Sequence, residues 1–296
     1  MTPPSTAEPA LSVVIPARNA AATLGEQLEA FTAQVWDRSF EVVVVDNGST
    51  DGTTELVTEL ARRDPRIHLE HATERTGIGY SRNVGIRASR ADAIAMCDAD
   101  DVVHPGWVAA IGDALRHVEF VTGPLDVHTL NADWLVRTRG LAIETGAGSF
   151  LGAFPFAHSC NVAFRRSLIE RVGYFDETLR NGSDVELSYR IWRAGVPLHY
   201  LDNAVVSYRY RTTLRELWLQ ARAYGRAKPE LLRRFRSAGT DIEVTRNWRG
   251  WLWLVRHAGL LASRAGRAQW VWAAGGRYGP LERTVTDRYH ERFGSR

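Results

Sequence analysis

Two carboxylates with a spacing suited to shared chemistry follow an apolar run. The segment AIAMCDADD (93–101) changes from aliphatic residues to Asp98-Ala99-Asp100-Asp101. If the run is a β-strand and its geometry continues, Asp98 and Asp100 point to the same side, where they repel unless a cation lies between them. Mg²⁺ and Mn²⁺ favour such oxygen ligands and share them with substrate phosphates. The alternative is a solvated acidic turn in which Asp101 caps the next segment.

A further carboxylate, Asp46, ends the stretch FEVVVVD (40–46) and is followed by the turn residues NGSTDG. The strand predicted there is too continuously apolar to have a solvated face. A carboxylate at its end can accept hydrogen bonds from a ribose or a base. The alternative is an ordinary strand-to-helix turn, with Thr50 or Asp51 as the helix cap.

Two other polar clusters stand where helices are predicted to begin. In GIGYSRNVGIRAS (77–89) the glycines allow close backbone approach, and Arg82 can contact phosphate. The third glycine comes too late for the dinucleotide-binding pattern G-x-G-x-x-G. In SDVELSYRIWRAG (183–195), Asp184 and Glu186 are either helix-start carboxylates or, for Asp184, a general base facing a bound hydroxyl.

Strand and helix patterns alternate over the first 120 residues. This order predicts an α/β fold with a mostly parallel twisted sheet flanked by helices, whose ligands bind at the carboxyl ends of the strands. Apolar runs predict strands at 11–17, 40–46, 66–72, 92–100 and 120–129, and at the start of 160–179. Helical spacing predicts helices at 21–34 and 183–195 and from residue 212 onward, after an extended stretch at 198–211.

The composition is that of a globular chain. Its 296 residues are 45% hydrophobic and 24% charged, enough for one large domain or one domain with an appendage. Two distant cysteines predict no disulfide framework and favour a reducing cytosol, and no Cys/His cluster has zinc spacing. Residues 1–10 are expected to be a disordered tail without signal-peptide character. The longest stretch without Asp, Glu, Lys or Arg (145–164) is broken by Gly, Pro and polar residues, so no membrane-spanning helix is predicted.

Charge and tryptophan are unevenly distributed. Residues 205–296 carry a net charge of +12 and six of the ten tryptophans, whereas residues 1–204 carry −9. In the stretch NWRGWLWLVRHAGLLAS, Trp248, Trp251 and Val255 follow a helical stripe, and Arg with Trp on such a helix suits an anionic membrane surface. The alternative is that these helices pack on the rest of the chain or on a second subunit. We expect no nucleic-acid partner, because no recognisable binding module is present.

Taken in order, these patterns resemble a family 2 glycosyltransferase with the GT-A fold. The resemblance covers roughly residues 11–225 and rests on VVIPARNAAATL, VVVVDNGSTDGT, YSRNVGI, CDADD, CNVAFRRSLIERVGYFDETL and SDVELSYRIWRAG. It implies a catalytic domain over 11–211, with residues 212–296 as a basic helical extension. It also implies an inverting transferase that uses a nucleotide-diphospho-sugar donor and Mn²⁺ or Mg²⁺. A saccharide or lipid-linked acceptor in cell-envelope glycan assembly, at the cytoplasmic face of the membrane, is the corresponding expectation.

The resemblance also implies a role for particular residues. Asp184 matches the family's catalytic base, and Asp98 and Asp100 match its metal-binding pair. Glu186 and Asn161 are candidates for contact with the acceptor. The donor nucleotide and sugar would be bound by Pro16, Arg18, Asn19, Asp46, Gly48, Ser49, Arg82 and Asp98. The chain departs from the family pattern at Ser183, where an acidic residue is frequent, and at Ser207-Tyr208, where many members have a histidine.

Two other functions compete with this interpretation. A sugar nucleotidyltransferase would have a glycine-rich loop with Arg or Lys directly after the first strand, whereas this chain has PARNAAATL there. A non-catalytic nucleotide-sugar-binding or scaffold protein would be indicated by loss of Asp98, Asp100 or Asp184, and all three are present. Acceptor choice is expected to reside in residues 126–158 and in the basic end.

Overall fold

The chain forms two compact units. The computed structural model describes residues 8–139, 146–242 and 249–293. The described parts of Met1–Thr129 and Ala142–Arg209 make the first unit, and those of Leu130–Leu141 and Tyr210–Arg296 make the second. After the first unit the chain enters the second at Tyr210, and the second unit also takes in residues 130–139, which chain order alone does not indicate.

Three residues of the predicted tail, 8–10, belong to the described structure. Residues 1–7 lie outside the described part of the chain. Pro9 is already buried, and Ala10 N–H donates to the carbonyl of Ser39 over 2.8 Å. The prediction of disorder is therefore wrong for Pro9 and Ala10, because this segment is bound to the residue that precedes the second strand.

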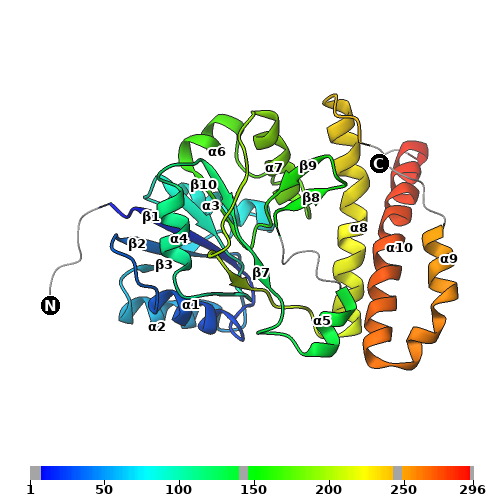
Figure 1. Ribbon diagram of the computed structural model, residues 1–296, viewed down its shortest axis with the longest axis horizontal. Helices are drawn as coiled ribbons and strands as arrows, with labels where there is room; N and C mark the ends of the chain where they lie inside the picture. The colour runs from blue at the N-terminus through cyan, green and yellow to red at the C-terminus, as the bar shows by residue number, and fades with distance from the viewer. Residues whose placement is uncertain (1–7, 140–145, 243–248, 294–296) are drawn as a thin grey trace. The chain divides into compact units, whose positions relative to one another are not determined.

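A seven-stranded sheet forms the centre of the first unit, in the order β11-β6-β10-β4-β1-β2-β3 (Figure 1). Neighbouring strands run parallel except at β10, which is antiparallel to both β4 and β6, so the prediction of a mostly parallel sheet is confirmed. The strands are β1 (Leu11–Ala17), β2 (Phe40–Asp46), β3 (Ile67–His71), β4 (Ala93–Met96), β6 (Phe120–Thr122), β10 (Val162–Arg165) and β11 (His199–Tyr200).

Helices cover both faces of this sheet, which explains why its strands are apolar without alternation. On one face, Val13 and Ile15 of β1 join a core cluster with Leu28 of α1. On the other face, Val14 joins a cluster with Ile86 of α3. The helices are α1 (Leu24–Thr32), α2 (Thr53–Arg63) and α4 (Trp107–Ala114) with the first cluster, and α3 (Ile78–Ala88), α6 (Arg166–Val172) and α7 (Ser183–Arg193) with the second.

Two small sheets complete the first unit, and they correct two predictions. One sheet joins β5 (Val102–Val103), β12 (Val206–Ser207) and β7 (Leu125–Asp126), and the other is the hairpin of β8 (Gly148–Phe150) and β9 (Phe154–Phe156).

The single strand predicted over 120–129 is wrong, because β6 ends before Gly123-Pro124 and β7 belongs to another sheet. A side chain at position 123 would lie 2.1 Å from the carbonyl oxygen of Ala204, and Pro124 has no N–H to donate. The extended stretch 198–211 likewise divides between β11 and β12.

The second unit is helical, which confirms the prediction for the described residues after 212. A capping box starts its first long helix, because Thr213 Oγ1 accepts the Glu216 N–H over 3.2 Å and the Glu216 carboxylate accepts the Thr213 N–H. The elements are α5 (Asp133–Arg139), α8 (Leu214–Ser237), α9 (Arg249–Arg256), the 3₁₀ turn η1 (Ala258–Ala262) and α10 (Arg264–Phe293). None of the described helices combines the length and apolarity that crossing a bilayer requires.

Glycines allow α8 and α10 to pack closely, side by side (Figure 1). A Cβ atom at Gly279 would lie 2.2 Å from the backbone oxygen of Arg222, a separation that real side chains do not reach. A Cβ atom at Gly276, on the same helix, would have Ala221 O at 4.0 Å as its nearest neighbour.

We expect Gly279→Ala to destabilise the helical unit, because the two backbones would have to separate. Overpacking of this kind costs about 1–3 kcal/mol. Gly276→Ala is the matched control and should leave stability unchanged or raise it by up to about 1 kcal/mol, since Ala has the higher helix propensity. Thermal unfolding followed by circular dichroism measures both, and equal midpoints for the two variants would contradict the packing described.

Candidate active site

The carboxyl ends of β1, β2 and β4 meet at one edge of the large sheet, and their loops carry most of the predicted site residues. Helix α1 holds the loop after β4 in place. Gln27 donates from Nε2 to the carbonyl of Asp98 over 3.3 Å and accepts the N–H of Val103 at Oε1 over 2.9 Å. Thr23 donates to the carbonyl of Ala99 over 3.1 Å. The acidic loop is therefore fixed at both of its ends by one helix.

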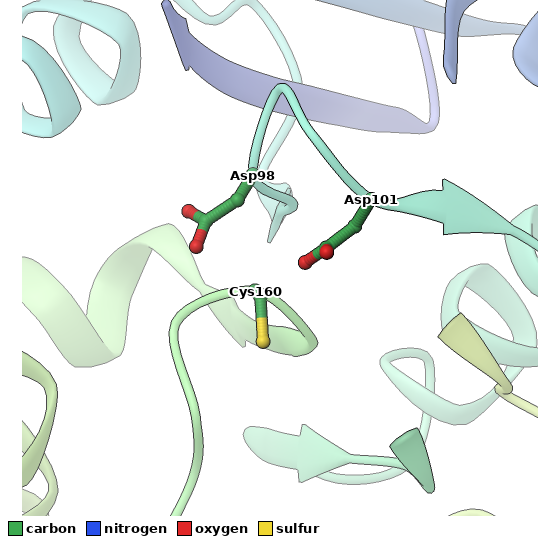
Figure 2. A group of neighbouring side chains, drawn as sticks. All are labelled: Asp98, Asp101 and Cys160. Carbon is green, nitrogen blue, oxygen red and sulfur yellow. The ribbon is translucent and has the colours of Figure 1, made fainter. Parts of the chain in front are cut away.

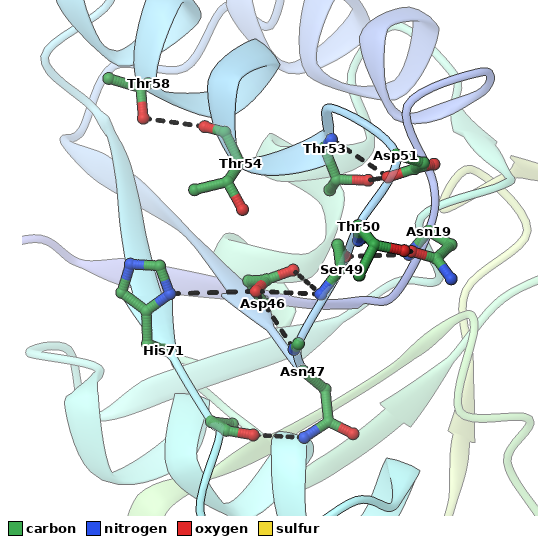
Figure 3. A network of polar contacts seen from close by, with 12 residues as sticks. Asn19, Asp46, Asn47, Ser49, Thr50, Asp51, Thr53, Thr54, Thr58 and His71 are labelled. Atoms are coloured by element: carbon green, nitrogen blue, oxygen red, sulfur yellow. Dashed lines mark hydrogen bonds and ion pairs between the residues drawn. The ribbon is translucent and has the colours of Figure 1, made fainter.

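Asp46 lies buried at the end of β2 and organises the turn that follows (Figure 3). Its carboxylate accepts the backbone N–H groups of Gly48 and Ser49, each over 3.2 Å. Gly48 has a φ of 74°, a conformation that favours glycine. His71 Nδ1 lies 3.9 Å from the same carboxylate. This geometry fixes the predicted donor-binding residues Asp46, Gly48 and Ser49 relative to one another.

The loop after β1 is bound to the loop after β2 through Asn19 (Figure 3). The backbone N–H of Asn19 donates to Ser49 Oγ over 2.9 Å, and the side-chain Oδ1 of Asn19 accepts the N–H of Thr50 over 2.8 Å. Asn19 has a positive φ of 52°, which Asn tolerates better than most residues. At the helix start that follows, it is Asp51 that accepts the N–H of Thr53, over 3.1 Å.

Pro16 and Arg18 flank the end of β1 in different environments. Pro16 is buried, two residues beyond the last β1 residue that pairs with β4, so its missing N–H removes no bond from that ladder. Arg18 is exposed and has no ion-pair partner among the residues that the structure describes. Its guanidinium is therefore available to a ligand at this edge.

Arg82 connects three segments of the site. It is only 5% exposed, and it donates from Nη2 to Asp98 Oδ1 over 3.3 Å and to Ser159 Oγ over 2.6 Å. Its Nη1 lies 3.4 Å from Ser183 Oγ, next to the predicted base. The Nε of Arg82 has no hydrogen-bond partner within the described residues. The guanidinium of Arg82, on helix α3, thus contacts both the loop after β4 and the start of α7.

Three predicted carboxylates share one neighbourhood. Burial raises the pKa of Asp98, the Arg82 guanidinium opposes this rise, and the charges of Asp100 and Asp184 add to it. Asp184 lies in the first turn of α7, where the helix dipole stabilises a carboxylate, and its Oδ2 is 3.5 Å from the N–H of Ser159. The structure therefore brings together Asp98, Asp100 and Asp184, which lie up to 86 positions apart in the sequence.

The strand geometry expected at Asp98 and Asp100 does not continue that far. Strand β4 ends at Met96, and residues 99–100 form a turn, so alternation between the faces of a sheet does not determine where Asp100 points. Asp100 is partly exposed, and its backbone carbonyl accepts a hydrogen bond from Arg209 Nε over 2.9 Å.

Asp101 is not a solvated cap, in contrast to the alternative raised by its sequence. It is fully buried and accepts the backbone N–H of Arg209 over 2.8 Å. With Asp98 and Cys160 it forms a close group whose potential ligand atoms lie within 4.8 Å of one another (Figure 2). The antiparallel pairing of β10 with β4 brings the cysteine there, because Val162 faces Met96 and Cys160 lies two residues before it. Sequence reasoning missed this group, since nothing in the chain indicated that pairing.

The two partly exposed carboxylates of the loop after β4 have the chemistry that a divalent cation requires. Mg²⁺ and Mn²⁺ select carboxylate oxygens, and both Asp98 and Asp100 are partly exposed. Burial raises the pKa of the Cys160 thiol well above its usual range, so the sulfur stays protonated and is a poor ligand. Asp98 and Asp100 are therefore the residues that would hold the ion, with Asp101 supporting the loop from inside.

The two acceptor-side candidates lie in internal networks. Asn161 is fully buried, accepts a hydrogen bond from Trp107 Nε1 over 2.9 Å and donates to the carbonyl of Ala204 over 2.8 Å. Glu186 pairs with Arg190 over 2.9 Å, and that arginine also binds carbonyl groups after α6. In this structure Asn161 presents no surface to an acceptor, and Glu186 is engaged in stabilising its own helix.

Ser207 lies where many members of the family have a histidine, and in this structure another histidine, His104, lies beside it. Ser207 Oγ lies 2.8 Å from His104 Nε2 and donates to Asp126 Oδ2 over 3.0 Å. Burial acts to raise the pKa of Asp126, but hydrogen bonds from Thr129, His128 and Ser207 outweigh it and lower that pKa to about 2. The imidazole of His104, which directly follows β5, therefore lies beside Ser207, and the ionised carboxylate of Asp126 lies close to both.

The fold is that of GT-A glycosyltransferases. It matches the mannosyltransferase PcManGT from Pyrobaculum calidifontis, solved in complex with GDP-Man and Mn²⁺, with a TM-score of 0.64. The match covers 93% of this chain and 88% of the mannosyltransferase, at 21% sequence identity. Identity at this level shows likeness of fold alone.

Sequence comparison gives the family. The model of glycosyl transferase family 2 matches residues 12–173, and that of glycosyl transferase family group 2 matches residues 93–274. The chain therefore belongs to glycosyl transferase family 2.

Curated relatives agree with this assignment. Glycosyltransferase AglE of Haloferax volcanii is 30% identical over 207 residues, which are 67% of this chain and 66% of AglE. The pre-mycofactocin glycosyltransferase of Mycobacterium tuberculosis is 30% identical over 235 residues, 75% of this chain and 48% of that protein. The matches thus span 48% and 66% of the length of these two relatives.

Proposed function

We propose that this protein transfers a sugar from a nucleotide-diphospho-sugar to an acceptor hydroxyl with inversion of configuration. One observation carries the proposal. Arg82, an almost buried cation, contacts Asp98 on the loop after β4 and Ser183 beside Asp184. Arg82 would supply a positive charge to the leaving diphosphate, and Asp184 a carboxylate to the attacking hydroxyl. These contacts hold the two side chains close together at the edge where such sheets bind ligands.

In the proposed reaction, Asp184 takes the proton from the acceptor hydroxyl. The oxygen attacks the anomeric carbon from the face opposite the leaving nucleoside diphosphate, so that one C–O bond forms as the other breaks. Arg82 stabilises the charge that develops on the leaving group. A divalent cation, Mn²⁺ or Mg²⁺, held by Asp98 and Asp100, would neutralise the diphosphate when bound.

The nucleotide would bind along the loops after β1 and β2. The nearly buried carboxylate of Asp46, at the end of β2, would accept a hydrogen bond from a base or ribose, and the network from Asn19 to Ser49 fixes these loops to each other. Pro16 and Arg18 border the same edge. The complex of PcManGT with GDP-Man and Mn²⁺ supports the proposal of a nucleotide-sugar donor with a metal, by likeness of fold.

The proposed acceptor is a saccharide or a lipid-linked saccharide used in cell-envelope glycan assembly. The support is the basic second unit, which suits an anionic surface at the cytoplasmic face of the membrane. Association of two copies through the helical unit remains part of the proposal, whereas nucleic acid has no place in it.

Thermal unfolding with UDP, GDP, dTDP and CDP, each with and without Mn²⁺ or Mg²⁺, tests the donor site. A ligand at about 100 times its dissociation constant stabilises by about 2.7 kcal/mol, which gives a clear shift. We expect a metal-dependent shift with one nucleotide, lost in Asp100→Ala. Asp92→Ala, an exposed site just before the other end of β4, is the matched control and should keep the shift. No shift with any nucleotide would point to a non-catalytic protein.

A further inference from the structure

Large apolar side chains stand exposed on one part of the helical unit, which we call the basic tip and define as residues 251–267. It comprises most of α9, the turn η1 and the start of α10. Trp251 is 42% exposed, Val255 74% and Leu261 42%. Leu254, the residue before Val255, is only 5% exposed. The apolar residues of α9 are thus divided between an inner side and a side that meets solvent.

The exposed residues belong to a well-packed structure. Trp270 donates from Nε1 to the carbonyl of Leu254 over 3.0 Å, which fastens α9 to α10. The rings of Trp253 and His257 stack with centroids 4.3 Å apart. A Cβ atom at Gly266 would lie 2.0 Å from the carbonyl oxygen of Leu260, so η1 packs tightly on the start of α10. Exposure of Trp251 and Val255 is therefore a property of an ordered surface.

The charge around these residues has one sign. Residues 244–281 contain six arginines and no Asp or Glu. Within the tip, Arg264 lies over the ring of Trp134 at 4.1 Å, and Arg267 donates to the carbonyl of Leu261. No carboxylate pairs with Arg256, Arg264 or Arg267 among the residues that the structure describes. Three cations without internal counterions therefore surround the exposed apolar groups.

We propose that the basic tip inserts its exposed apolar side chains into the headgroup region of a bilayer that contains anionic lipid. Apolar residues that project between unpaired arginines match such a surface, where acyl chains and phosphates lie within a few ångströms of each other. Charge disfavours a second copy of the same tip, since its three arginines would face the same three arginines of the other copy. The inference deepens the proposed membrane location and rests on it, but it does not depend on the transfer reaction.

Vesicle sedimentation of the full chain tests this proposal. We expect binding to phosphatidylcholine vesicles that contain phosphatidylglycerol and little binding to phosphatidylcholine alone. Val255→Glu should lower the partition coefficient at least tenfold, because it places a charge in the inserted surface. Val35→Glu is the matched control, since Val35 is 84% exposed in the first unit, and it should bind as the original chain does. Arg256→Gln should lower binding roughly fivefold, from about 1 kcal/mol per arginine near the surface.

Several results would overturn the inference. These are equal binding to neutral and anionic vesicles, no binding to either, or unchanged binding of Val255→Glu. Sedimentation velocity without lipid adds one more: a dimer that Val255→Glu dissociates would assign the tip to a second copy. The nucleotide-dependent thermal shift is measured on the same variants. Its persistence when vesicle binding fails would separate this inference from the donor-site proposal.

Discussion

Asp184→Asn is expected to lower the rate of sugar transfer by about 10²- to 10⁴-fold, the usual contribution of a general base. The amide keeps the size of the carboxylate but cannot take the proton of the acceptor hydroxyl. Since Asp184 is assigned to the acceptor, nucleotide binding should be preserved. Transfer is measured with the donor whose nucleotide gives the thermal shift, and binding by that shift.

Two comparisons make this result specific. Asp92→Asn removes one negative charge at an exposed position before β4 and should transfer at the original rate. Asp184→Glu keeps the base but moves it by one methylene, so partial activity is expected. An Asp184→Asn variant that turns over at the original rate would remove Asp184 from the mechanism.

Arg82→Met is expected to have the second largest effect. It removes the cation that contacts Asp98, Ser159 and the neighbour of Asp184, while keeping an apolar side chain of similar length. Loss of one donor to a charge that develops in the transition state costs about 10²- to 10³-fold in turnover. A lower unfolding temperature should accompany it, because Asp98 would lose its positive partner.

Arg87→Met is the control on the same helix, since Arg87 is exposed and stacks on Tyr174 at 4.8 Å. It should change neither transfer nor donor binding. Arg82→Lys keeps the charge but cannot contact three partners with one ammonium group, so we expect it to resemble Met in rate. If Arg82→Lys keeps full activity, the fork of hydrogen bonds from the guanidinium is irrelevant to the reaction and only its charge matters.

The parts of the fold that could be predicted are those where local pattern and tertiary context agree. Strands β1 and β2 occupy Leu11–Ala17 and Phe40–Asp46 as their apolar runs indicated, because both are buried on two faces. Asp46 could be placed at the sheet edge for the same reason. The helices α3 and α7 were also found, since glycines precede both and α7 has carboxylates in its first turn.

The parts that could not be predicted depend on contacts between distant segments. The sequence shows three acidic residues within four positions, but only the pairing of β10 with β4 and the hydrogen bond from Arg209 explain why Asp101 is buried. Asn161 looked like a site residue, yet it satisfies buried groups of Trp107 and Ala204. One break in a strand could have been predicted from the sequence, because Gly123-Pro124 ends β6 and allows the close approach of Ala204.

Arg209 is the last residue of the first unit, and its backbone and side chain both bind the acidic loop. Its guanidinium also pairs with Glu26 of α1, the helix that holds the same loop. The point where the chain leaves the first unit is thus part of the scaffold of Asp98 and Asp100. Exchange of C-terminal regions between relatives must therefore place the junction after Arg209 if the contacts of this residue with the acidic loop are to be kept.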